Sequence, residues 1–211
     1  MRSRHGALVA ATFVAALLGG LPLTSDALTP PPRFETATFG GGCFWCLEAV
    51  FEEVAGVRKV VSGYAGGQTD RPSYKDVCDG DTGHAEVVQI TFDPAVVTYD
   101  ELLAVFFSVH DPTTVDRQGA DVGSQYRSII LAHDQNQQTA ARAWIGRLTE
   151  EGVFDRPIVT DVVPLATFFP AEEYHQDYYR RNPSQGYCQA VIAPKMAKFR
   201  QQHAQQLKTG R

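Results

Sequence analysis

Two of the chain's four cysteines, Cys43 and Cys46, follow three consecutive glycines in the stretch FGGGCFWCLE, residues 39 to 48. Because glycine adopts backbone conformations closed to other residues, these glycines indicate a tight turn or a ligand close to the main chain. Apolar residues then recur every three or four positions up to Val54, which predicts a helix with Cys43 in its first turn and Gly56 as its C-terminal cap. The N–H groups and the dipole at a helix start stabilise an anion, so Cys43 is predicted to be a nucleophilic thiolate.

Glu86 is the second candidate for chemistry, in a predicted strand over residues 84 to 94. By the two-residue period of a strand, Glu86 shares a face with Val88, Ile90 and Phe92, which is the face expected to be buried. Burial raises the pKa of a carboxyl group, so Glu86 could stay protonated near neutral pH and serve as an acid. The alternative is that Glu86 lies at the solvated end of the strand and pairs with an arginine.

Polar and aromatic residues are concentrated in two predicted loops, residues 63 to 86 and 110 to 128. Loops supported by a rigid sheet are the usual place for catalytic groups. Tyr74 and Tyr126 can donate O–H hydrogen bonds there and Asp121 can accept one, although a single tyrosine is more often a core or rim residue than a catalyst. An apolar pocket wall is supplied by the two aromatic residues between the cysteines, Phe44 and Trp45. Four histidines are more typical of loops and caps than of metal ligands: His84, His110, His133 and His175.

Strand and helix patterns alternate along the chain. Strands are predicted at residues 33 to 39, 57 to 67, 84 to 94, 126 to 133 and 156 to 164. Helices are predicted after the glycines, at 98 to 110 with Thr98 as cap and Glu101 in a capping box, and at 134 to 152, with helical pieces at about 170 to 180 and 194 to 207. This order predicts a layered α+β domain in which helices pack against a sheet.

The first residues have the composition of an export signal. Basic residues at 2 to 5 precede the apolar run ALVAATFVAALL, and small residues stand at Ser25 and Ala27, in the pattern of a cleavage site. We expect a secretory signal at residues 1 to 27, a linker at 28 to 36 and a single domain at 37 to 211, exported and periplasmic. The alternative is an uncleaved membrane anchor or a tail.

Charge and cysteine usage narrow the class of protein. The chain has 211 residues and a net charge of −5 without basic clusters, which argues against nucleic-acid binding. Four cysteines in an exported chain could form two structural disulfides. A domain of this size can build a core without disulfides, so the alternative is that the cysteines carry out redox chemistry. A thioredoxin-like disulfide exchanger and a zinc-binding module are two rival classes. Neither explains Glu86 together with two tyrosine-rich loops, and no second close pair of zinc ligands is present.

Five long motifs, in this order, resemble the A-type peptide-methionine (S)-S-oxide reductase family (methionine sulfoxide reductase A). They are GGCFWCLEAVFEEVAGV, SGYAGG, PSYKDVCDGDTGHAEVVQITFDP, HDPTTVDRQGADVGSQYRS and EEYHQDY followed by GYC. The resemblance covers residues 37 to 200. It implies a two-layer α/β sandwich with a mixed sheet, a ferredoxin-like core and a loop-rich C-terminal segment. The resemblance also implies that Cys43 is the nucleophile and Glu86 the catalytic acid. Tyr74 and Tyr126 would donate hydrogen bonds to the substrate oxygen, and Asp121 would contact the substrate amide. The pocket for the methyl group would be formed by Phe44 and Trp45.

The family's reaction, as the resemblance implies it, is reduction of the S epimer of methionine sulfoxide, in proteins and free, as repair of oxidative damage. A cysteine attacks the sulfur and becomes a sulfenic acid, which a second thiol converts to a disulfide. A thioredoxin-like dithiol then reduces that disulfide, and the enzyme, a monomer, needs no metal or organic cofactor.

The identity of the second thiol stays open between two residues. Cys46 lies three positions after Cys43 but stands where many relatives have glycine, whereas Cys188, in NPSQGYC, matches the resolving cysteine in the tail of many relatives. A relay through both is one possibility. Cys78 matches a family position without a redox role and is expected to be a buried or spectator thiol. Ala120, where asparagine is frequent, leaves the catalytic set intact.

Overall fold

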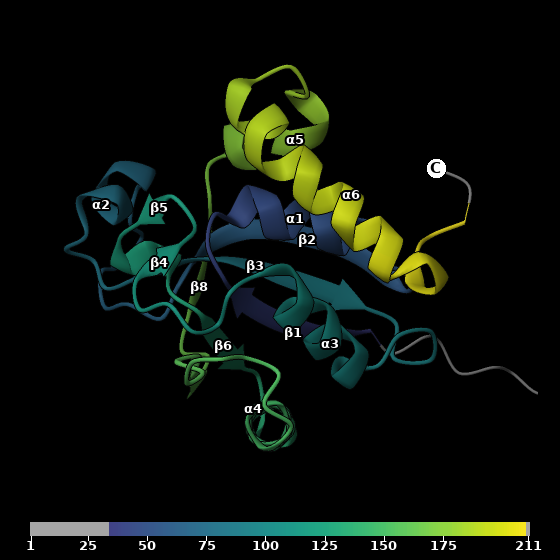
Figure 1. Cartoon of the computed structure of the whole chain (residues 1–211). Helices are drawn as coiled ribbons and strands as arrows, with labels where there is room; N and C mark the ends of the chain where they lie inside the picture. The colour runs from purple at the N-terminus through teal and green to yellow at the C-terminus, as the bar shows by residue number, and fades with distance from the viewer. Residues whose placement is uncertain (1–33, 210–211) are drawn as a thin grey trace, which may run out of the picture. The chain divides into compact units, whose positions relative to one another are not determined.

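The computed structural model describes residues 34 to 209 of the chain. Its main sheet has six strands in the order β7-β6-β1-β3-β2-β8 (Figure 1). The strands span Glu35–Gly40 (β1), Val57–Ala65 (β2), Ala85–Phe92 (β3), Ile129–Ala132 (β6), Asp161–Pro164 (β7) and Phe168–Pro170 (β8). Neighbouring strands are antiparallel except β6 and β7, which are parallel, so the sheet is mixed, as the resemblance implied.

The centre of the sheet has a ferredoxin-like arrangement. Apart from a short helix before β3 and a two-stranded hairpin with a 3-10 turn before β6, its elements follow each other as β1-α1-β2-β3-α3-β6, where α1 is Phe44–Glu52 and α3 is Tyr99–Val109. The four strands lie in the order β6-β1-β3-β2, which is the split βαβ topology. The expected α+β fold with a ferredoxin-like core is therefore confirmed.

Strand β3 divides its side chains between two cores, as its two-residue period predicted. Val88, Ile90 and Phe92 join α1 and α3 in the main core. Ala85 and Val87 point to the other face and belong to a smaller cluster. Glu86 is two residues before Val88, so it lies on the same face of β3, toward α1 and the main core.

The predicted starts and ends of helices hold for α3 and partly for α1. Thr98 caps α3, and Glu101 completes a capping box with it. In α1 the first helical residue is Phe44, so Cys43 is the N-cap and not part of the first turn. The helix ends at Glu52, and Gly56 takes its positive φ of 83° in the turn beyond that end.

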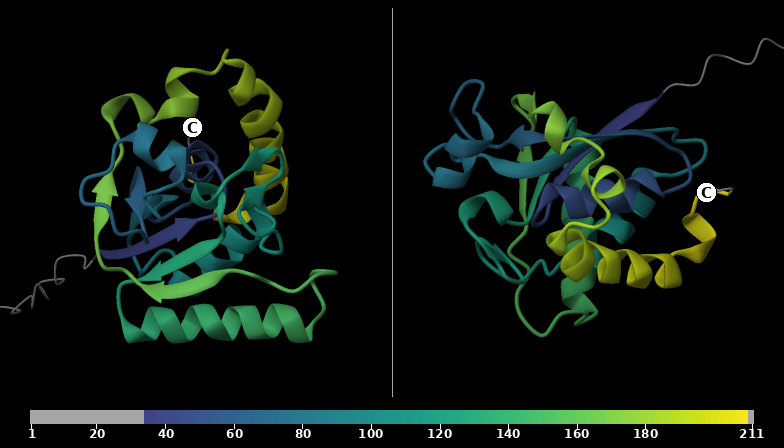
Figure 2. Two further views of the ribbon diagram at one scale, coloured as in Figure 1. Left: turned by 90° about the vertical axis from the view of Figure 1, so that its left-hand side faces the viewer. Right: turned by 90° about the horizontal axis from the view of Figure 1, so that it is seen from above.

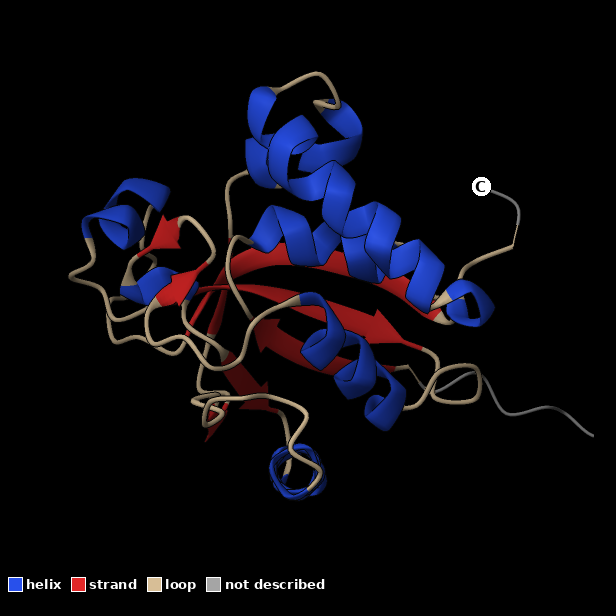
Figure 3. Cartoon of the chain, viewed as in Figure 1, coloured by secondary structure: helices blue, strands red, loops and turns tan. Residues whose placement is uncertain are grey.

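Two further helices complete the layer that covers the main core. Helix α4, Gln135–Glu150, lies against β6 and β7 and also contacts α3 (Figure 2). Helix α6, Ala193–Gln202, contacts both α1 and α3. Figure 3 shows α1 and α6 stacked over the strands.

The segment after β7 is richer in irregular structure than the sequence predicted. Strand β8 pairs with β2 and was not predicted, because its three residues are too few to show a period. A 3-10 turn at Glu173–His175 and helix α5, Tyr178–Arg181, replace the helix expected at 170 to 180. A π-helix at Cys188–Ile192 then leads into α6.

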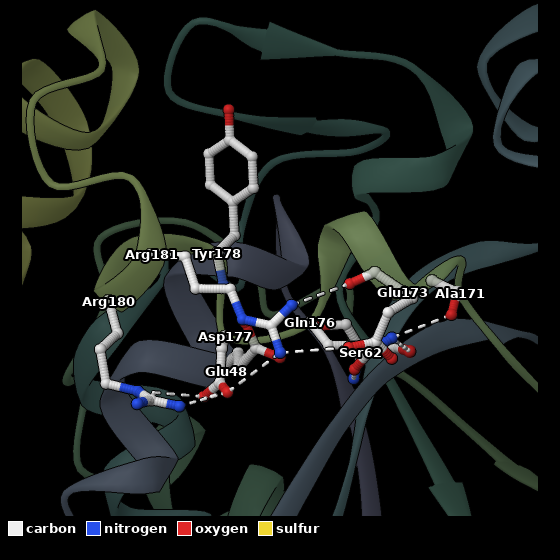
Figure 4. A network of polar contacts seen from close by, with 9 residues as sticks. All are labelled: Glu48, Ser62, Ala171, Glu173, Gln176, Asp177, Tyr178, Arg180 and Arg181. Atoms are coloured by element: carbon white, nitrogen blue, oxygen red, sulfur yellow. Dashed lines mark hydrogen bonds and ion pairs between the residues drawn. The ribbon is translucent and has the colours of Figure 1, made fainter.

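A polar network fixes this segment onto α1 and β2 (Figure 4). The side chain of Gln176 accepts a hydrogen bond from the Ser62 N–H and donates to the carbonyl groups of Ser62 and Ala171. Glu48, buried in α1, accepts a hydrogen bond of 3.2 Å from the N–H of Tyr178. The ring of Tyr178 points away from this network (Figure 4). It stacks on the ring of Trp45, the second residue of α1.

The predicted export signal at residues 1 to 27 lies outside the described residues. β1 begins at Glu35, inside the range 28 to 36 that was assigned to a linker. Among the residues that the structure describes, no helix has the length and apolar character needed to cross a membrane.

Candidate active site

Apart from Tyr126, which lies in the 3-10 turn Ser124–Tyr126, the residues singled out for chemistry come from five separate segments that meet at one end of the sheet. They are the turn between β1 and α1, the start of β3, the first residue of α2 (Tyr74–Asp79), the hairpin β4–β5 (Arg117–Gln118 and Asp121–Val122), and the C-terminal segment. Figure 1 shows α2 and the hairpin together at this end. The N-terminus of α1 points toward it.

The glycines before Cys43 are required by close packing. A Cβ on Gly40 would stand 2.9 Å from the Glu86 carbonyl oxygen, which belongs to the backbone of the neighbouring strand. Gly42 has a φ of +93°, a conformation that side chains rarely adopt, and a Cβ there would meet Gln118 at 2.5 Å. The predicted tight turn is therefore confirmed, and it places Cys43 beside β3.

Glu86, the second residue of β3, is buried beside the start of α1, and only 1 % of it is exposed. Its Oε2 accepts a hydrogen bond of 3.0 Å from the N–H of Phe44. Burial, helped by the charges of Asp121 and Cys46, raises the pKa of Glu86 to about 8, against the lowering effect of hydrogen bonds from Phe44 and Cys43. The carboxyl group is thus protonated at neutral pH. The alternative of a solvated Glu86 paired with an arginine is wrong.

The two thiols of the Cys43-x-x-Cys46 pair do not ionise as the sequence predicted. Burial, a hydrogen bond with Cys46 and the charge of Glu86 raise the pKa of Cys43 well above its ordinary value. The hydrogen bond from Cys43 lowers the pKa of Cys46 to about 7, with a smaller contribution from Lys195. The prediction of a resting thiolate on Cys43 is therefore wrong. The hydrogen bond between the two thiols favours the charge on Cys46, so Cys43 keeps its proton.

An aromatic wall stands next to the thiols, as predicted for Phe44 and Trp45. The Phe44 ring is buried and lies 5.1 Å from the His175 ring, and Trp45 lies 5.5 Å from the same ring. Tyr178 stacks on Trp45 with ring centroids 3.6 Å apart and planes 6° from parallel. Neither ring nitrogen of the buried His175 has a hydrogen-bond partner among the described residues. His175 and Tyr178 were missed as wall residues, because nothing in their local pattern shows that their segment folds back onto α1.

Tyr74 and Tyr126 are half-buried and pack against the edge of the main core. Tyr74 begins α2, and Tyr126 ends a 3-10 turn at Ser124–Tyr126. Both hydroxyls lie within electrostatic range of Glu86, and burial raises the pKa of each tyrosine far above neutrality. Both can therefore donate hydrogen bonds at working pH.

Asp121 is held by a tyrosine that the sequence did not single out. The hydroxyl of Tyr187 donates a hydrogen bond of 2.7 Å to Asp121 Oδ2, and the same hydroxyl lies 4.0 Å from the sulfur of Cys46. Cys188, the next residue, is fully buried, and burial together with the charge of Cys46 raises its pKa. Cys78 was expected to be a buried or spectator thiol; it is exposed, so the expectation of burial is wrong.

The chain's sequence matches the family described as "PMSR: Peptide methionine sulfoxide reductase" over residues 35 to 208. The chain belongs to the peptide methionine sulfoxide reductase family. Curated relatives named "Peptide methionine sulfoxide reductase MsrA" include one from Halobacterium salinarum, 59% identical over 80% of this chain and 95% of the relative. Another, from Deinococcus radiodurans, is 53% identical over 87% of this chain and 89% of the relative.

Solved structures of the family have the same fold. Mxr1 from Saccharomyces cerevisiae in reduced form has a TM-score of 0.68 and 34% identity, covering 76% of this chain and 91% of that one. Methionine sulfoxide reductase A of Corynebacterium diphtheriae has a TM-score of 0.66 and 37% identity, covering 74% of this chain and 78% of that one. The family's thiol chemistry agrees with what the site contains. Among residues 34 to 209, no group of three His, Cys, Asp or Glu side chains is placed to hold a metal ion.

Proposed function

We propose that this protein is a peptide-methionine (S)-S-oxide reductase, a thiol oxidoreductase that repairs oxidised methionine. The observation that carries the proposal is the arrangement of Cys43 and Glu86. A thiol at the N-cap of α1 lies beside a buried, protonated carboxyl group, which the adjacent N–H of Phe44 holds in place. Membership of the family supports the same reaction.

In the reductive step, Cys43 attacks the sulfur of the sulfoxide while Glu86 protonates its oxygen. Tyr74 and Tyr126 donate hydrogen bonds to that oxygen, and Phe44 and Trp45 enclose the methyl group. The thiol and the sulfoxide become a sulfenic acid on Cys43 and a thioether, which is methionine. The oxygen moves from substrate to enzyme, so no other oxidant or reductant takes part in this step.

Cys43 must lose its proton as it attacks, and Cys46 is placed to take it. The hydrogen bond between the two thiols raises the pKa of Cys43 and lowers the pKa of Cys46 to about 7, so Cys46 is the thiol that ionises near neutral pH. Transfer of one proton along this bond converts Cys43 into the thiolate and leaves Cys46 as a thiol. Cys46 therefore serves as the base of the reductive step in this chain, before any role in disulfide formation.

Recycling then uses both remaining candidates. The Cys46 thiol condenses with the sulfenic acid to give a Cys43–Cys46 disulfide and water. The Cys188 thiolate attacks Cys46, releases Cys43 and forms a Cys46–Cys188 disulfide, which an external thioredoxin-like dithiol reduces. Cys188 is fully buried and its pKa is raised, so the second exchange requires the segment around Tyr187 to move away from Asp121.

In this proposal Asp121 accepts a hydrogen bond from the main-chain amide of the substrate. The hydrogen bond that Tyr187 donates to Asp121 orients the carboxylate for that contact. The protein works as a monomer without a metal or organic cofactor. The composition of residues 1 to 27 supports export, and the place of action is then the periplasm.

The test is an assay of the reduced protein on separated S and R epimers of a blocked methionine sulfoxide, with dithiothreitol as reductant. We expect turnover of the S epimer only, and none by Cys43→Ser. Equal rates on both epimers would exclude the stereochemical assignment, and turnover by Cys43→Ser would exclude the mechanism.

A further inference from the structure

We propose that Glu172 is a positioning residue of the reductive step: its carboxylate sets Tyr74 in the place from which the hydroxyl of Tyr74 reaches the sulfoxide oxygen. The role of Tyr74 rests on the proposed function, whereas the placement of Tyr74 by Glu172 can be tested without it. Glu172 does not itself reach the reacting atoms in this proposal. It acts on the donor through the backbone.

The two oxygens of Glu172 bind two different elements. Oε1 accepts a hydrogen bond of 2.9 Å from the N–H of Tyr74, the first residue of α2. Oε2 accepts a hydrogen bond of 2.9 Å from the hydroxyl of Tyr64 in β2. Hydrogen bonds to an ionised acceptor are about twice as strong as neutral ones. One carboxylate thus ties the start of α2 to the sheet.

Tyr64 connects this tie to the centre of the site. It is fully buried, lies directly across from Glu86 in the pairing of β2 with β3, and its ring is 5.9 Å from that of Phe44. The carboxylate of Glu172, bound to the hydroxyl of Tyr64, is therefore held at a fixed position relative to Glu86 and Phe44. Through its second hydrogen bond Glu172 holds Tyr74 at a fixed position relative to the same two residues.

Helix α2 has little else to hold it. Val77 is its only buried residue, and its capping box with Ser73 is closed within the segment itself. The Tyr74 ring packs against the edge of the main core and lies 4.4 Å from the ring of His175. His175 belongs to the 3-10 turn whose N-cap residue is Glu172, so this ring contact and the hydrogen bond to Glu172 come from the same short turn.

The carboxylate is not used for an ion pair. Its nearest basic group in the described part of the chain is His175, with Nε2 at 3.9 Å, and burial lowers the pKa of that imidazole, so it is neutral. The adjacent Glu173 is different, since it is exposed and pairs with Arg181 at 3.1 Å (Figure 4). Glu173 therefore supplies a matched control one residue away.

The first test measures single-turnover reduction of the S epimer by prereduced protein. We expect Glu172→Ala to lower the rate constant about tenfold or more, a scale typical of a misplaced catalytic group, with Glu173→Ala within about twofold of wild type. In a Tyr74→Phe background, Glu172→Ala should cost less than about threefold, because the group that it positions is already gone. An equal loss in both backgrounds, or no loss in either, would overturn the proposal.

If Glu172→Ala does not fold, judged by circular dichroism, Glu172→Gln takes its place. The amide keeps the size of the side chain, but it has one oxygen for two donors and no charge. We expect a smaller loss, roughly threefold to tenfold, which again disappears in the Tyr74→Phe background. Loss of the same size in both backgrounds counts against the proposal here too.

The second test needs no enzymatic activity. Partial burial raises the pKa of the Cys78 thiol overall. A hydrogen bond with Tyr74 acts to lower that pKa, and the charge of Glu172 raises it by a smaller amount. Loss of the Glu172 charge alone would therefore speed alkylation of Cys78, and displacement of Tyr74 would slow it. We expect iodoacetamide at pH 8, followed by peptide mapping, to show slower labelling in Glu172→Ala and Tyr74→Phe and unchanged labelling in Glu173→Ala. Faster labelling in Glu172→Ala would refute the placement of Tyr74, even if the protein reduced no sulfoxide.

Discussion

Replacement of Glu86 by glutamine tests the proposed acid most directly. The amide cannot deliver a proton but still fills the buried space and can donate a hydrogen bond, so we expect the low end of the general-acid range, a loss of about 10² in the reductive rate constant. With a pKa of about 8, roughly nine-tenths of the Glu86 carboxyl is protonated at pH 7 and about one-tenth at pH 9. The contribution of this acid to the wild-type rate should therefore fall about tenfold between pH 7 and pH 9.

The assay is rapid-quench formation of methionine by prereduced protein, without an external reductant, between pH 6 and 10. We expect a bell-shaped profile in the wild type, rising through about 7 as the pair Cys43 and Cys46 ionises and falling through about 8 with Glu86. Glu86→Gln should lose the falling limb. Glu150→Gln, an exposed residue at the end of α4, is the control. A rate within threefold of wild type at pH 7, or an unchanged falling limb in Glu86→Gln, would refute the assignment.

Four further predictions follow from the buried groups. Because folding raises the pKa of Glu86, stability from this group is lost as pH rises from its unfolded value toward about 8. The advantage of Glu86→Gln over wild type in free energy of unfolding should thus grow by about 1 kcal/mol between pH 7 and pH 9 in urea titrations, and a constant difference would contradict this. Cys43→Ser should form no methionine in a single turnover, and measurable product would exclude Cys43 as the nucleophile. Cys46→Ser should slow the reductive step at pH 7 and move the rising limb upward, since the buried Cys43 must then ionise without its partner; a limb that stays at about 7 would argue against Cys46 as the base. Cys188→Ser should leave the single turnover unchanged and slow recycling by a thioredoxin-type reductant about tenfold; recycling at the wild-type rate would make Cys46 the sole resolving residue.

Much of the secondary structure that positions the site could be predicted from the sequence, because it depends on interactions between residues close together in the chain. The capping box of α3 uses residues within one turn, and the face of Glu86 on β3 follows from the two-residue period. The glycines before Cys43 mark a turn that only they can make. The capping box and the strand period are decided by neighbours a few positions away, so both can be predicted from the order of the residues alone.

Other features of the site depend on segments that lie 42 to 141 residues apart in the chain. The N–H of Phe44 meets Glu86 across 42 positions, but Tyr187 meets Cys46 across 141. Ionisation of the thiols depends on burial and on the bond between them, and a helix start alone predicted the charge on the wrong sulfur. Likewise Glu172 reaches Tyr74 across 98 positions, and no local pattern distinguishes it from Glu173 beside it.

The sequence by itself thus determined which groups exist, where the turn before Cys43 lies and which face of β3 carries Glu86. The tertiary structure alone decided which of the paired thiols keeps its proton, how Trp45 is covered by Tyr178, and which glutamate holds Tyr74. The physical reason is that desolvation and hydrogen bonding act over a few ångströms in space, whatever the distance along the chain.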